Sequence, residues 1–200
     1  MLNNQGARRV AAVVIEPPAK LLLRMHVSPD AVTVTGTVLV ILTALVCFPS
    51  GWLVTGSIII GLLAISDLLD GTMARLSNSS GPWGNFLDAT LDRLADGAIL
   101  SGLIVWGALS GEIWLVGGGV FALVMGQVTS YAKARAEAVG AQANVGIAER
   151  AERLFVILIA TLLAGLGVPW VLPAALWILG ALGVITVIQR IVVVRRQLRP

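Results

Sequence analysis

Five of the eleven acidic residues fall between positions 67 and 96, in a stretch that otherwise has the composition of membrane helices. Asp67 and Asp70 are spaced i and i+3. Asp88, Asp92 and Asp96 recur every fourth residue. Helical spacing places each set on one face of its helix. Ionisable groups at membrane depth cost about 2.5–3.5 kcal/mol each, so they are retained where they bind something.

The turn between these two helices is short, which predicts antiparallel neighbours whose carboxylate faces meet near one end. The carboxylates expected to converge are Asp67, Asp70, Asp88 and Asp92. Four like charges cannot all stay ionised together without compensation, and Arg75 and Arg93 are too few to supply it. Two divalent cations would neutralise the cluster. An all-oxygen ligand set favours Mg²⁺ or Mn²⁺, with Ca²⁺ possible. Two such metal ions side by side suit phosphoryl transfer.

The rest of the chain must hold these helices in a membrane. Of 200 residues, 57% are hydrophobic and 12% are charged, which predicts an all-α integral membrane protein without a separate soluble domain. The single cysteine, Cys47, excludes a disulfide framework or a thiolate metal site. Apolar runs bounded by turn residues predict six membrane helices, near 31–49, 52–74, 85–108, 113–136, 154–171 and 173–194.

The basic residues set the orientation. Thirteen of the fourteen Lys and Arg residues lie toward the same side of this six-helix arrangement, and the exception, Arg93, lies inside the third predicted helix. Cytoplasmic flanks retain Lys and Arg, so both termini and the aspartates are expected at the cytoplasmic side of the cell membrane. Residues 1–27 are expected to form a juxtamembrane segment lying along the membrane surface, where Pro17 and Pro18 would limit any helix to short pieces. Residues 1–200 then form a single membrane domain.

Residues 67–92 read DLLDGTMARLSNSSGPWGNFLDATLD. This segment resembles the signature of the CDP-alcohol phosphotransferase family, DxxDGxxARx8Gx3Dx3D, at every fixed position. The resemblance implies six membrane helices, transfer of a phosphoalcohol from a CDP-linked donor to an alcohol acceptor with release of CMP, and a homodimer. It implies no nucleic-acid partner.

The resemblance also implies roles for individual residues. Asp67, Asp70, Asp88 and Asp92 would bind two Mg²⁺ ions, with Mn²⁺ possible, and Asp92 would also deprotonate the acceptor hydroxyl. The residues matched to the CDP-binding positions are Asp30, Ala31, Val32, Thr33, Gly71, Ala74, Arg75 and Gly81. The chain departs from the family at Gly81, where relatives commonly have a small hydroxyl residue; Ser79 and Ser80 come just before it.

A basic cluster surrounds the polar stretch between the fourth and fifth predicted helices, in KARAE at 133–137 and ERAER at 149–153. With SPDAVT at 28–33, these stretches are similar to actinobacterial phosphatidylinositol phosphate synthases, which implies CDP-diacylglycerol as donor and 1D-myo-inositol 3-phosphate as acceptor. The candidates for binding the acceptor phosphate are Lys133, Arg135, Arg150, Arg153 and Arg195. Positive-inside topology alone would also place basic residues here.

Two alternatives remain open at the level of the sequence. Within the family, glycerol-3-phosphate would use the same basic pocket and give phosphatidylglycerol phosphate. From another class, a membrane metal transporter would also place aspartates in membrane helices. Transport predicts acidic groups along a path through the bilayer, whereas here they gather at one end, which favours the enzyme.

Overall fold

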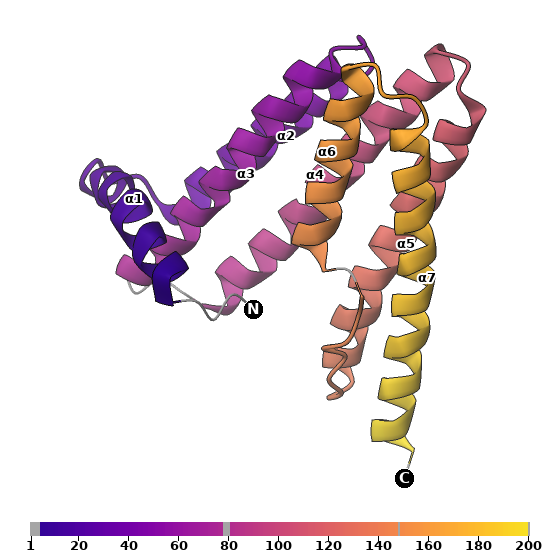
Figure 1. Ribbon diagram of the computed structural model, residues 1–200. Coiled ribbons are helices and arrows are strands. Elements are labelled where there is room, and N and C mark those ends of the chain that lie inside the picture. The colour runs from indigo at the N-terminus through magenta and orange to yellow at the C-terminus, as the bar shows by residue number, and fades with distance from the viewer. Residues whose placement is uncertain (1–4, 78–80, 148, 200) are drawn as a thin grey trace. The chain divides into compact units, whose positions relative to one another are not determined.

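The computed structural model describes the backbone of residues 5–77, 81–147 and 149–199, and the side chains of these residues except at 5–14 and 66–68. Within these ranges every regular element is an α-helix. The helices are α1 (Gln5–Arg24), α2 (Pro29–Cys47), α3 (Leu53–Leu76), α4 (Pro82–Leu109), α5 (Ile113–Ala138), α6 (Arg150–Gly165) and α7 (Val171–Leu198), drawn in Figure 1. The predicted all-α class is therefore confirmed.

Four of these helices, α2, α3, α5 and α7, are long and apolar enough to cross a membrane. The structure thus supports a multi-pass membrane protein but not the count of six. Helix α6 has 16 residues, about 24 Å of helix, which is shorter than the hydrocarbon core. Helix α4 carries charged residues over its first half, which lowers its hydropathy.

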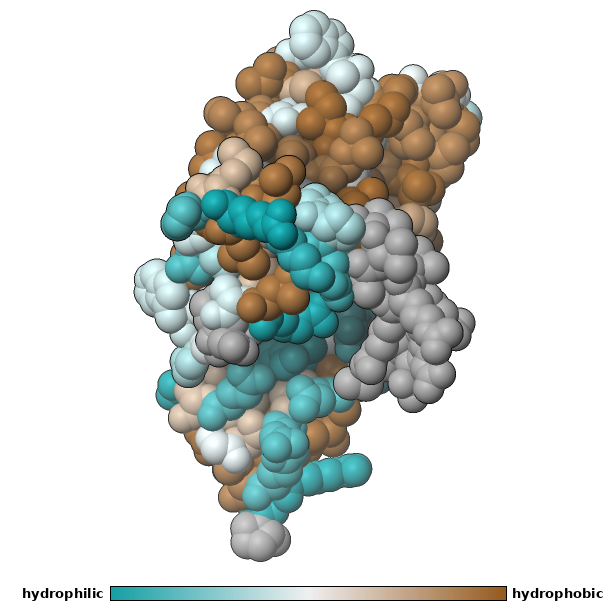
Figure 2. Space-filling view, turned by 90° about the vertical axis from the view of Figure 1, so that its left-hand side faces the viewer, coloured by the Kyte–Doolittle hydropathy of each residue, from teal (hydrophilic) through white to brown (hydrophobic). Residues whose placement is uncertain are grey.

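Large hydrophobic side chains are exposed along these helices, as expected of surfaces in contact with lipid. Leu62 is 64% exposed and Ile65 59% exposed on α3, and Leu42 is 55% exposed on α2. Figure 2 shows broad exposed areas of hydrophobic residues on one face. Monomeric soluble proteins rarely expose apolar surface in this quantity.

Helix α1 corrects one expectation, because it is a single helix of 20 residues that runs through Pro17 and Pro18. A proline removes one helical N–H and frees the carbonyl of the preceding turn. Both prolines are exposed, so water can satisfy these carbonyls. The Lys20 ammonium also pairs with the Glu16 carboxylate at 2.8 Å, one turn apart across the prolines.

Helix α6 lies several residues before the predicted run 154–171. It begins at Arg150 because Glu149 and Glu152 form a capping box, in which each side chain accepts from the other residue's backbone N–H. It ends at Gly165, just before Gly167, whose φ of +91° cannot continue a right-handed helix. Helix α4 likewise begins at Pro82, a favoured first helical residue, three residues before the predicted run 85–108.

The chain divides into two compact units. One comprises residues 1–42 and 59–95, and the other comprises residues 43–58 and 96–200. The first unit contains α1, the first part of α2, the last part of α3 and the aspartate-bearing start of α4. The second unit contains the rest of α4 and all of α5, α6 and α7.

In the second unit, α5 packs along α7, and Figure 1 shows the two helices side by side. Glycines make this close approach possible. A Cβ at Gly180 would lie 2.3 Å from the Phe121 ring, and one at Gly183 would lie 2.7 Å from Cβ of Met125. Small residues of this kind let helix backbones approach closely in membranes.

Candidate active site

The first unit joins the start of α2 to the signature segment of α3. Ser28 caps α2, since its Oγ accepts from the Ala31 backbone N–H at 3.2 Å and Pro29 is the first helical residue. One turn on, Thr33 Oγ1 lies 2.6 Å from Oδ2 of Asp70 and 3.1 Å from the Pro29 carbonyl oxygen. A hydroxyl has one proton, and the shorter contact to the charged oxygen is the better hydrogen bond. Thr33 thus fixes the orientation of the Asp70 carboxylate.

The predicted metal ligands are only partly described. Asp70 is half-buried, and its Oδ1 also accepts from the Gly71 N–H at 2.6 Å. Asp88 is exposed and Asp92 is half-buried, one turn further along α4. The Asp67 side chain lies outside the described residues. Among the side chains that are described, no three of the His, Cys, Asp or Glu type are grouped so that they could hold an ion. The four-aspartate site therefore stays a prediction.

The predicted CDP-binding residues lie on α2, on α3 and just before α4. Gly71 is exposed, and a Cβ there would meet no atom within 4 Å, so the helix surface at this point is open to a ligand. The guanidinium of Arg75 is exposed and donates to the Gly71 carbonyl oxygen at 3.2 Å and to Thr72 Oγ1 at 3.1 Å. Asp30 Oδ2 accepts from the Trp83 indole N–H at 2.9 Å.

The remaining members of this set make local contacts: the Ala31 N–H donates to Ser28 Oγ at 3.2 Å, and the Ala74 carbonyl oxygen accepts from Ser77 Oγ at 3.4 Å. Ala31 and Gly81 are exposed, whereas Val32 and Ala74 are half-buried. Ser79 and Ser80 lie outside the described residues. The roles of the whole CDP-binding set remain predictions.

The second unit brings two of the predicted acceptor-binding residues together. Arg150 and Arg153, one turn apart on α6, line one pocket of about 30 Å³ between α4, α5, α6 and α7. Asp96 and Gln127 also line it, and the rest of the lining is apolar. Lys133 and Arg135 near the end of α5, and Arg195 near the end of α7, are exposed and do not line this pocket.

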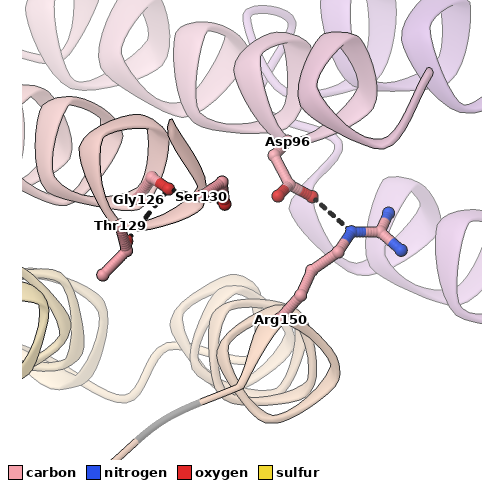
Figure 3. Close-up of polar contacts among 5 residues, drawn as sticks. All are labelled: Asp96, Gly126, Thr129, Ser130 and Arg150. Carbon is pink, nitrogen blue, oxygen red and sulfur yellow. Dashed lines mark hydrogen bonds and ion pairs between the residues drawn. The ribbon is translucent and has the colours of Figure 1, made fainter. Parts of the chain in front are cut away.

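Arg150 is held by Asp96, a contact that the sequence did not reveal. Its Nε lies 3.3 Å from Oδ1 of Asp96, and both side chains are largely buried, at 28% and 20% exposed. Figure 3 shows Asp96 on α4 and Arg150 on α6 pointing toward each other. Asp96 continues the every-fourth-residue stripe of α4, which was the one signal in the sequence.

The segment between α5 and α6 is tied to α7 by residues that sequence reasoning also missed. Arg190 donates to the Val145 carbonyl oxygen at 3.0 Å and to the Thr129 carbonyl oxygen. The Gln197 amide exchanges two hydrogen bonds with the backbone of Gln142, at 2.8 and 2.7 Å. These contacts fix the approach of the chain to the start of α6, where Arg150 and Arg153 lie.

Known proteins match this chain over nearly its whole length. Residues 26–194 match the family model described as CDP-alcohol phosphatidyltransferase. The phosphatidylinositol phosphate synthase of Streptomyces avermitilis is 48% identical, over 97% of this chain and 83% of the relative. The enzyme of the same name from Cutibacterium acnes is 46% identical, over 92% and 94% of the two chains.

Solved structures agree with the sequence matches. The crystal structure of Mycobacterium tuberculosis phosphatidylinositol phosphate synthase with CDP-DAG bound has a TM-score of 0.85 and 37% identity, and covers 92% of this chain and 94% of its own. A structure of that enzyme with manganese and citrate also has a TM-score of 0.85, at 38% identity, and covers 90% and 88%. The chain belongs to the CDP-alcohol phosphatidyltransferase family.

Proposed function

We propose that this chain transfers a phosphatidyl group from CDP-diacylglycerol to 1D-myo-inositol 3-phosphate, giving phosphatidylinositol phosphate and CMP. The observation that carries the proposal is the 48% identity, over 97% of the chain, to a phosphatidylinositol phosphate synthase. The structure of the mycobacterial relative with CDP-DAG bound supports the donor. The complete family signature at 67–92 supports the reaction class.

The metal site is proposed on the aspartates of α3 and α4. Asp67, Asp70, Asp88 and Asp92 would hold two Mg²⁺ ions, with Mn²⁺ possible, and the manganese in a mycobacterial relative supports a divalent ion of this class. The described donors fit such ions, because they are carboxylate oxygens. When bound, the ions supply charge neutralisation at the pyrophosphate.

The chain's own residues would perform the remaining steps. The Asp92 carboxylate accepts the proton of the acceptor hydroxyl as its oxygen bonds to the lipid-side phosphorus of the donor. The bond from that phosphorus to the bridging oxygen breaks, and the electron pair leaves on CMP. Arg75 and the open surface at Gly71 would bind the cytidine diphosphate.

The acceptor phosphate would be bound by the basic residues near α6. Arg150 and Arg153 are the best supported, because both line one pocket. Lys133, Arg135 and Arg195 are exposed on the ends of their helices and complete the proposed set. Arginine suits this task, since its planar fork matches phosphate oxygens.

For the membrane arrangement, six spans with both termini and the active site at the cytoplasmic side remain the proposal. The one-sided distribution of Lys and Arg supports it. In this arrangement α4 and α6 cross the membrane with α2, α3, α5 and α7, and α1 lies on the cytoplasmic surface. The homodimer implied by the family resemblance stays a prediction.

The deciding experiment measures CMP release from CDP-diacylglycerol by the purified protein with Mg²⁺. Inositol 3-phosphate, glycerol-3-phosphate and unphosphorylated inositol are supplied one at a time. We expect CMP with inositol 3-phosphate only. Turnover with glycerol-3-phosphate and none with inositol 3-phosphate would replace the proposed acceptor and favour phosphatidylglycerol phosphate synthesis.

Thr33→Val tests the hydrogen bond that orients Asp70. Valine has nearly the same shape without the hydroxyl, so we expect Mn²⁺ affinity to fall about tenfold, as is common when a partner of a metal ligand is removed. Electron paramagnetic resonance of free Mn²⁺ during titration measures the affinity without turnover. The matched control is Thr35→Val, which removes an exposed hydroxyl from the same helix. Equal Mn²⁺ affinity in the two variants would remove Thr33 from the site.

Arg153→Ala tests the acceptor side. Loss of one charged hydrogen bond to phosphate corresponds to about 1.5–3 kcal/mol, so we expect the acceptor KM to rise by about 10- to 100-fold and the donor KM to change little. Steady-state CMP release, with each substrate varied in turn, measures both. The control is Arg199→Ala, which removes an exposed arginine at the end of α7. If both KM values rise together, Arg153 does not select the acceptor.

A further inference from the structure

The Asp96–Arg150 ion pair is unexpected beside a phosphate-binding pocket. Arg150 is the first residue of α6, where the helix dipole disfavours a cation. The capping box of Glu149 and Glu152 already satisfies this helix end. The stability of α6 itself therefore does not explain an arginine at position 150 or its acidic partner on α4.

The charge of Asp96 also opposes binding of a phosphate. Its carboxylate lines the same pocket as Arg150 and Arg153 and is only 20% exposed, so its repulsion of an anion is poorly screened. The pocket of about 30 Å³ has room for about two water molecules and not for a sugar ring. The acceptor can therefore meet these arginines only at the pocket mouth, where the direction of each guanidinium decides how well it binds.

The geometry of the pair supplies that direction. The contact joins Oδ1 of Asp96 to Nε of Arg150, at 3.3 Å. In Figure 3 the two terminal nitrogens of Arg150 lie on the side of the guanidinium away from Asp96. A guanidinium held by Nε keeps the edge formed by those terminal nitrogens directed away from the carboxylate, and that edge can donate two parallel hydrogen bonds to a phosphate.

We infer that Asp96 is a positioning residue for the acceptor: it holds Arg150 by Nε so that the terminal nitrogens present a preset fork to the acceptor phosphate. This inference rests on the proposed function. Asp96 lies outside the family signature, which ends at Asp92, and it acts through Arg150 rather than on the reacting atoms. The fixed fork avoids part of the cost of ordering a long side chain when the acceptor binds.

Four variants test the inference by acceptor KM: Asp96→Ala, Asp96→Asn, Arg150→Ala and the double variant Asp96→Ala/Arg150→Ala. We expect Asp96→Ala to raise the acceptor KM about tenfold with little change in donor KM, because misplacement of a binding group is costly. Asp96→Asn keeps an oxygen that accepts from Nε, so its KM should rise less. In the Arg150→Ala background, Asp96→Ala should have little further effect on the acceptor KM, because the role proposed for Asp96 acts through Arg150.

The control is Glu16→Ala, which breaks the exposed Glu16–Lys20 ion pair of α1 and should leave both KM values unchanged. A lower acceptor KM in Asp96→Ala or Asp96→Asn would show that repulsion dominates and would overturn the inference. Additive effects in the double variant would overturn it too, as would donor and acceptor KM values that rise together. If wild type releases no CMP with inositol 3-phosphate, the proposed function fails first. If wild type turns over and Asp96→Ala and Asp96→Asn both keep the wild-type acceptor KM, only the positioning role fails.

Discussion

Asp92→Asn is expected to release CMP at least about 100-fold more slowly than wild type while it binds CDP-diacylglycerol with nearly wild-type affinity. Asparagine has the shape of aspartate and keeps one oxygen for a metal ion, but it cannot accept the proton of the acceptor hydroxyl. General-base catalysis contributes about 10²–10⁴-fold to the rate of a reaction of this kind. The loss should appear in kcat, because the base acts only in the transition state.

Two measurements are needed for this variant. Single-turnover CMP release gives the chemical rate, and equilibrium binding of CDP-diacylglycerol in detergent gives donor affinity. Thr90→Val is a suitable control, since Thr90 is exposed on α4 and its hydroxyl donates only to its own helix, at the Phe86 carbonyl oxygen. A rate for Asp92→Asn within a few-fold of wild type would remove the general-base assignment. If Asp92→Asn loses both donor binding and turnover, Asp92 acts chiefly as a metal ligand.

Asp92 and Asp96 lie one helical turn apart on α4, yet we expect their substitutions to change different kinetic constants. Asp92→Asn should lower kcat, whereas Asp96→Ala should raise the acceptor KM. This contrast is informative because both variants remove a carboxylate from the same helix stripe. A general loss of charge or a local distortion of α4 would affect both kinetic constants in both variants.

Local sequence patterns predicted most of the helices. Apolar runs bounded by turn residues placed α2, α3, α4 and α5 to within a few residues of their ends. The fifth predicted helix, near 154–171, was displaced, because the capping box at Glu149 begins α6 within a polar stretch that hydropathy assigns to a loop. The prolines of α1 were a second source of error: they predicted short helical pieces, whereas α1 continues through Pro17 and Pro18, whose exposure leaves the freed carbonyls open to water.

The contacts that organise the candidate site could not be predicted in this way. Helical periodicity shows which residues share a face of one helix, as it does for Asp88, Asp92 and Asp96 on α4. It does not show which residue of another helix faces them. Thr33 donates to Asp70 across 37 positions of the sequence, and Arg150 pairs with Asp96 across 54. Both contacts depend on how the helices pack, to which small residues throughout the chain contribute.

Gly183→Ala is expected to destabilise the protein by about 1–3 kcal/mol, the usual cost of forcing an extra carbon into a packed interface. The added Cβ would lie 2.7 Å from Cβ of Met125, an atom that no side-chain rotation can move. Helices α5 and α7 must therefore separate locally. For a chain of this length the midpoint of thermal unfolding in detergent should fall by roughly 3–10 °C.

Gly61→Ala is the matched control, because it makes the same change within α3, where an added Cβ would meet no atom within 4 Å. Alanine favours the helix over glycine by about 1 kcal/mol, so the midpoint of the control should stay level or rise slightly. Gly183→Ala has the same gain in helix propensity, which offsets part of its packing cost. The packing cost is therefore read from the difference between the unfolding midpoints of the two variants. Equal midpoints would mean that α5 and α7 adjust without cost, and that the glycines of α7 do not set the packing that ties the α5–α6 segment and its arginines in place.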